Sequence, residues 1–139
     1  MPIGSVLPTE LGGVELHTFA IGEEILARLA ERLGVTIDEL ETAFASEHGA
    51  RFMQIYALRL PGTDASALAT GWAAIAYPPE VPDVAVSEET IDGRAVTVVH
   101  SPSASPRLGT FYLYGSGPTL FVVQALERDV AMEALGSLP

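Results

Sequence analysis

Three histidines are the side chains in this chain best suited to metal binding or acid–base catalysis. They are His17, His48 and His100, and their spacing matches no recognised metal-ligand pattern. His48 comes at the end of a predicted helix, where a surface histidine interacts favourably with the helix dipole. The sequence therefore predicts no metal site.

Serine hydrolysis requires a serine activated by a histidine, together with an oxyanion hole. The segment 115–117 (Gly-Ser-Gly) is too short for a nucleophile elbow and lies between two predicted strands. His100 and Ser101 are neighbours at a strand end, so their side chains point to opposite faces. We therefore predict no catalytic residue. The alternative is a small pocket enzyme, a hydrolase or an isomerase, that uses His17 or His100 as acid–base and a tyrosine hydroxyl as donor.

Absent residue types exclude further chemistry. The 139 residues contain no Cys, Lys or Asn. Without Cys there is no disulfide or thiolate ligand, and without Lys there is no Schiff base or phosphate-binding P-loop lysine. The glycines at 12–13 and 115–117 do not open a helix after a strand, so they do not predict a phosphate site. We expect no cofactor.

The charge balance disfavours nucleic acid and anionic membranes as partners. Seven arginines, scattered along the chain, face 18 acidic residues, which gives a net charge of −11. No apolar run reaches the roughly 20 residues of a membrane-spanning helix. The first ten residues lack the pattern of a signal peptide. The localisation is therefore unknown: this chain by itself suggests the cytoplasm, and an exported protein requires that a signal or anchor has been removed.

Apolar periodicity and turn residues predict the elements. Isoleucines and leucines recur every four residues from Ile21 to Leu33, which predicts a helix over 22–33 that ends at Gly34. A capping box at Thr36 and Glu39 predicts a second helix running to about His48. The remaining expected elements are strands over 14–20 and 51–60, a helix from residue 63 or 64 to 76, a strand pair joined by a turn at 92–93, strands over 111–114 and 119–125, and a helix over 128–135.

The resulting order is β-α-α-β-α-β-β-β-β-α within one domain, 1–139, preceded by an extended lead-in over 1–12. Adjacent hairpins favour antiparallel pairing. We therefore predict an α+β fold with a single antiparallel sheet of about five or six strands and with the helices packed on one face.

Four segments resemble patterns found in small, uncharacterised α+β proteins of GC-rich bacteria, which are often exported. These segments are LPTELGGVEL (7–16), IDGRAVTVV (91–99), FYLYGSGPTLFVVQA (111–125) and ALGSLP (134–139). They consist of hairpin and packing residues. The resemblance therefore implies a fold type and a removed export signal, and it implies no activity.

Side-chain alternation suggests an unusual second face of the sheet. If the helices cover Leu16, Met53, Ile55, Phe111, Leu113, Phe121 and Val123, the alternate residues face outward. These are His17, Phe19, Phe52, Gln54, Tyr56, Leu58, Tyr112, Tyr114, Leu120, Val122 and Gln124. An exposed face rich in aromatic and aliphatic side chains marks a partner or ligand surface.

The binding-face candidates are the aromatic and hydrogen-bonding members of that set, namely His17, Phe52, Gln54, Tyr56, Tyr112, Tyr114 and Gln124. We expect a non-catalytic binding module, an accessory subunit or a self-associating protein. Its partner would be a protein or a second copy of the chain, with a small apolar ligand as a further option. The competing interpretation is that the sheet curls, or that loops such as 78–87 and 101–109 cover this face as a second core layer.

Overall fold

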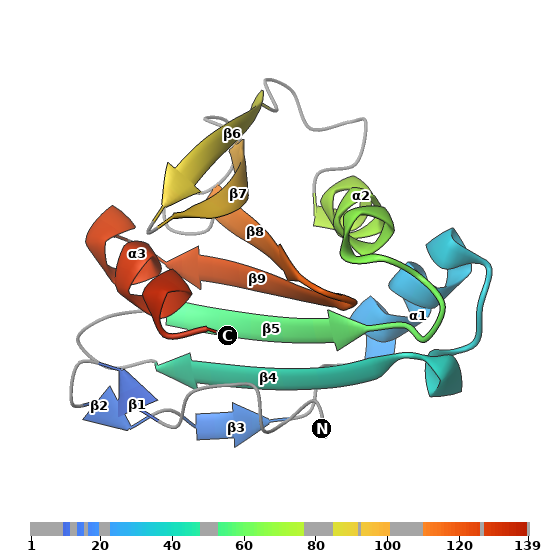
Figure 1. The fold of residues 1–139 in the computed structure, drawn as a ribbon. Helices are drawn as coiled ribbons and strands as arrows, with labels where there is room; N and C mark the ends of the chain where they lie inside the picture. The colour runs from blue at the N-terminus through green and yellow to red at the C-terminus, as the bar shows by residue number, and fades with distance from the viewer. Residues whose placement is uncertain are drawn as a thin grey trace.

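The computed structural model describes residues 10–11, 14–15, 17–19, 23–47, 53–76, 85–91, 93–100, 110–125 and 127–138. These residues form helices that pack around a strongly twisted sheet (Figure 1). In chain order the elements are β1 (Glu10–Leu11), β2 (Val14–Glu15), β3 (His17–Phe19), α1 (Glu23–Leu33), the 3-10 helix η2 (Ile37–Glu39), β4 (Glu41–Glu47), β5 (Met53–Arg59), α2 (Ala65–Ala76), β6 (Ala85–Ile91), β7 (Arg94–His100), β8 (Thr110–Ser116), β9 (Thr119–Ala125) and α3 (Arg128–Gly136).

The main sheet has the strand order β3-β4-β5-β9-β8-β7-β6, and all of its pairings are antiparallel. The predicted α+β class and antiparallel sheet are confirmed. The sheet has seven strands where about five or six were expected. Of the expected lead-in, Glu10 and Leu11 form β1, which pairs with β2, and the rest lies outside the described residues.

The predicted second helix is correct only in its first turn. The Glu39 carboxylate accepts a hydrogen bond from the Thr36 N–H at 2.7 Å, as in a capping box, but the helix that follows is a single 3-10 turn. From Glu41 onward the chain pairs with β5 residue by residue. The prediction was wrong here because the pairing with β5 satisfies the backbone and places Phe44 and Ala45 against opposite faces of the sheet.

Both faces of the sheet are covered in its centre. On one face, Met53, Ile55 and Val123 pack in one core cluster with the apolar residues of α3. On the other face, Leu58 and Val122 share a second cluster with residues of α1 and α2. The expected placement of helices on one face therefore holds for α1 and α2, whereas α3 lies on the opposite face.

Two tight hairpins set the register of β6 with β7 and of β8 with β9. Ile91 pairs with Arg94, so the first turn holds two residues, as predicted. Ser116 pairs with Thr119, which makes the second turn Gly117-Pro118 rather than a four-residue loop. Gly93 and Gly117 have φ values of 75° and 58°, in the left-handed region that favours glycine.

Gly115 allows α2 to approach β8 closely. A Cβ built on Gly115 would lie 2.9 Å from the Ala65 Cβ, which is shorter than real contacts between such atoms. We expect Gly115→Ala to lower the free energy of unfolding by about 1–3 kcal/mol, because neither methyl group can rotate away. Denaturant unfolding measures this loss.

The double variant Gly115→Ala/Ala65→Gly serves as its control. It removes the opposing methyl group, so it should recover part of the lost stability. A Gly115→Ala protein as stable as the parent would contradict the close packing.

Asp64 is the N-cap of α2. Its Oδ1 accepts hydrogen bonds from the Ala67 N–H at 3.0 Å and from the Ser66 hydroxyl at 2.8 Å, and both hold the pKa of the Asp64 carboxyl below its ordinary value. A lowered pKa stabilises the fold above the ordinary aspartate pKa of about 4, and this contribution is lost as the pH falls through the lower value. Asp64→Ala should therefore lower the Tm at pH 7, and the difference in Tm should shrink in acid.

Thr63→Ala is the matched control for the Asp64 prediction, because the Thr63 side chain takes no part in these two bonds. Melting curves from pH 7 down to pH 3 test the prediction. A Tm difference between the parent and Asp64→Ala that stays constant over this range would show that the charge of Asp64 does not stabilise the helix.

Candidate functional site

The binding-face candidates do not share one face of the sheet. Because Ser116 pairs with Thr119, each odd-numbered residue of β8 lies opposite an even-numbered residue of β9. Tyr112 pairs with Val123 and Tyr114 pairs with Phe121, so both tyrosines lie on the α3 face. The predicted grouping of these tyrosines with Gln124 was wrong, because side chains directly opposite in a sheet point to the same side.

Gln54, Tyr56 and Gln124 do share a face, the one covered by α1 and α2. Gln54 and Gln124 are direct cross-strand neighbours on β5 and β9. The Tyr56 hydroxyl donates a hydrogen bond to Gln54 Oε1 at 3.0 Å. The Tyr56 ring stacks on Phe44 at 4.7 Å and packs at a tilt against Trp72 at 5.0 Å, measured between ring centroids. These side chains are buried or half-buried, so they belong to an internal layer.

Tyr112 and Tyr114 take part in the packing of α3. Tyr112 is buried, and Tyr114 stacks on Phe121 with ring centroids 6.0 Å apart. The Arg94 guanidinium lies over the Tyr114 ring at 5.2 Å and also donates a hydrogen bond to the carbonyl of Leu135 in α3. This arrangement anchors the end of α3 to β7 and β8.

The remaining candidate residues, His17, His48, Phe52 and His100, lie only partly within the described residues. The His17 backbone pairs with Ser46 in β3 and β4, its side chain lies outside the description, and Phe52 and His48 lie outside the described residues altogether. His100 Nδ1 is 2.7 Å from the Thr110 Oγ1. In the described part of the chain, no group of three or more His, Asp or Glu side chains could hold a metal ion.

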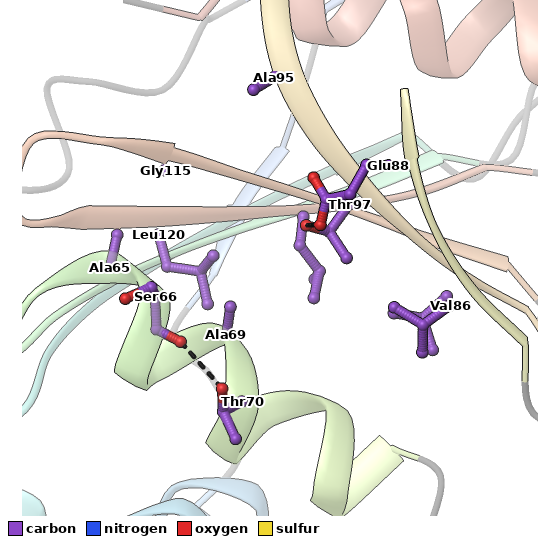
Figure 2. Close-up of a pocket in the computed structure, with 12 residues that line it drawn as sticks. Ala65, Ser66, Ala69, Thr70, Val86, Glu88, Ala95, Thr97, Gly115 and Leu120 are labelled. Atoms are coloured by element: carbon purple, nitrogen blue, oxygen red, sulfur yellow. Dashed lines mark hydrogen bonds between the residues drawn. The ribbon is translucent and has the colours of Figure 1, made fainter. Parts of the chain in front are cut away.

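A cleft that the sequence did not indicate lies between α2 and the β6–β7 hairpin (Figure 2). Its volume is about 580 Å³. It occupies the α1/α2 face of the sheet, because the register aligns Thr97 with Leu113 and Gly115 with Leu120. Its lining consists of small and aliphatic residues with a few polar groups, namely Ala65, Ser66, Ala69, Thr70, Val86, Glu88, Ala95, Thr97, Val99, Leu113, Gly115 and Leu120.

The two walls of the cleft differ in chemistry. Ala65, Ser66, Ala69 and Thr70 come from α2, and the hydroxyl of Thr70 donates to the Ser66 carbonyl oxygen at 3.1 Å (Figure 2). The opposite wall carries the Glu88 carboxylate, which accepts a hydrogen bond from the Thr97 hydroxyl at 3.0 Å.

The β6 wall also leaves apolar surface open. Val86 is 62% exposed, and among the described residues it is the most exposed large hydrophobic side chain. Leu113 and Leu120, which also line the cleft, are buried.

One sequence signal could have pointed to this cleft. Residues 65–70 read Ala-Ser-Ala-Leu-Ala-Thr, which places small residues at positions i, i+1, i+4 and i+5 on one side of a helix. A helix face made of small residues covers little of the sheet beneath it, because its side chains are short. No local sequence pattern predicted that residues of β6 would form the opposite wall on the α1/α2 face of the sheet.

The helices of the described part are too short or too polar to cross a membrane.

Burial raises the pKa of the Tyr56 hydroxyl. A raised pKa stabilises the fold below the ordinary tyrosine pKa of about 10, and this contribution is lost as the pH rises through the folded-state value. Tyr56→Phe should cost about 1 kcal/mol at pH 7, because Gln54 loses its hydrogen-bond donor. The parent protein should lose this advantage above pH 10, and urea unfolding at both pH values measures it. An advantage that grows in alkali would contradict the burial of the hydroxyl.

A scan against protein-family models gave no match for this chain, and neither the search of curated proteins nor the search of solved structures found a similar protein.

Proposed function

We propose that this domain is a non-catalytic binding module, and that the cleft between α2 and the β6–β7 hairpin is its binding surface. The proposal rests on one observation: the helices leave part of the α1/α2 face of the sheet, near its β6 edge, uncovered. Strand β9 is buried along its whole length, whereas Val86 at the edge of the same sheet is 62% exposed. A ligand in the cleft would complete this cover.

The size and lining of the cleft favour a ligand with an apolar body. Small-molecule sites occupy about 300–1,000 Å³ and combine apolar walls with a few polar groups. The cleft, of about 580 Å³, has this combination. Each Å² of apolar surface that a ligand buries there contributes roughly 25 cal/mol to binding.

The composition of the lining favours binding over acid–base catalysis. Glu88 is the only ionisable side chain among the described residues that line the cleft. The alternative of a small pocket enzyme, with a histidine acid–base and tyrosine donors, needs a second titratable group near the first. His100, Tyr112 and Tyr114 are not part of this lining.

Leu120 belongs both to the outward face that side-chain alternation predicted and to the lining of the cleft. A protein partner or a second copy of the chain stays a prediction, as does the absence of nucleic-acid binding. Light scattering of the purified chain tests self-association directly.

Adding a phenylalanine to either wall should block the cleft. We expect Ala69→Phe in α2 and Ala95→Phe in β7 each to weaken binding of 1-octanol by about ten-fold or more, a loss of roughly 1.4 kcal/mol. Amide chemical shifts of ¹⁵N-labelled protein, followed during titration with 1-octanol, measure the affinity and show where the alcohol binds.

Met132→Phe is the matched control. Met132 lies on α3, is 38% exposed and does not line the cleft, so this variant should bind 1-octanol like the parent. If the shifts map elsewhere, or if all three variants bind equally, the cleft is not the binding surface.

A further inference from the structure

We infer that the cleft prefers a small ligand that carries a positively charged amine on an apolar body, with Glu88 as the group that selects the charge. This inference rests on the proposed function and names the ligand class for the same site. The juxtaposition that carries it is one carboxylate beside an aliphatic surface, and the described residues of the lining include no cationic side chain.

The comparison of Glu88 with its neighbour Glu89 shows why Glu88 is suited to this role. Alternation along β6 points the two side chains to opposite faces. Glu89 pairs with Arg128 of α3, with 2.5 Å between Glu89 Oε1 and Arg128 Nη2, and this hydrogen bond lowers the pKa of the Glu89 carboxyl. Glu88 faces the cleft, and the group that binds it among the described residues is the neutral hydroxyl of Thr97. Its charge is therefore left for a ligand.

The Thr97 hydrogen bond also fixes the position of the carboxylate. Thr97 lies directly opposite Glu88 on β7 and donates to Glu88 Oε1 at 3.0 Å. Figure 2 shows Glu88 and Thr97 together on the wall opposite Ala69 and Thr70 of α2. A ligand amine can thus reach a carboxylate that is already oriented, while its apolar body contacts Val86 and Ala69.

The volume of the cleft and the charge of the protein favour a small cationic molecule over a protein strand as the occupant. The volume of about 580 Å³ falls within the range of small-molecule sites. A second copy of β6 paired antiparallel at its edge, in the register centred on residue 88, would bring Glu88 of both copies face to face, which is unfavourable. The net charge of −11 adds a general attraction for a cation.

The size of the preference follows from the exposure of Glu88. An exposed ion pair contributes little, so we expect a two- to five-fold tighter binding of the amine than of a neutral ligand of equal length. The preference should fall as salt is added, because screening weakens an exposed pair.

The test compares octylammonium, 1-octanol and octanoate, which share one alkyl chain and differ in charge. Their affinities are measured by amide chemical shifts at low and at 0.5 M salt. In the parent protein we expect the order octylammonium, 1-octanol, octanoate, from tightest to weakest. Glu88→Gln should remove the two- to five-fold difference between the affinities for octylammonium and 1-octanol. Because Glu88 is exposed, this variant should fold normally.

Glu31→Gln is the matched control, since it removes the same charge from an exposed position on α1, away from the lining. It should keep the amine preference. Equal binding of octylammonium and 1-octanol in the cleft would overturn the inference and leave the proposed function standing. Failure of all three ligands to shift the cleft amides would overturn the proposed function itself. A Leu-Lys alternating hexapeptide that shifts the β6 amides when octylammonium does not would assign the site to a peptide instead.

Discussion

Strand β9 constrains the whole structure because all seven of its residues, Thr119–Ala125, are buried. A strand that is apolar on both sides needs a cover on each face and a neighbour along each edge. Strands β5 and β8 supply the two edges, α3 covers one face, and α1 with α2 cover the other. Exposing any one of its large side chains would cost roughly 1.5–3 kcal/mol, which explains why the helices divide between the faces.

The cleft exists because α1 and α2 cover only part of their face of the sheet. Helix α2 packs on β5, β8 and β9, and its small residues with Gly115 bring it close to the sheet. Strands β6 and β7 form the edge of the sheet that lies beyond α2 (Figure 1). The β6–β7 wall is held from the opposite side, where Arg128 binds Glu89 and Arg94 binds both the Tyr114 ring and the carbonyl of Leu135. Helix α3 therefore fixes one wall of a cleft that it does not line.

The candidate site was predictable only in part. Alternation correctly grouped Gln54 and Tyr56 on one face of β5, and Leu120 of the expected face does line the cleft. The tyrosines of β8 were assigned to the wrong side. An even number of loop residues always places odd-numbered residues opposite even-numbered ones, so the two-residue turn at Gly117-Pro118 already contained this information. The cleft itself had no sequence motif, because its lining comes from segments far apart in the chain.

Local patterns determined the elements whose own residues fix their conformation. The period of apolar residues specified α1, the Asp64 cap marked the start of α2, and glycine at position 93 specified a two-residue turn, since each of these acts within a few residues. Tertiary contacts decided the rest. Residues 41–47 form a strand because β5 offers a complete set of backbone partners, and this outweighs the capping box that precedes them. Which face each side chain occupies, and therefore where the cleft opens, depended on pairings between distant strands that no local pattern encodes.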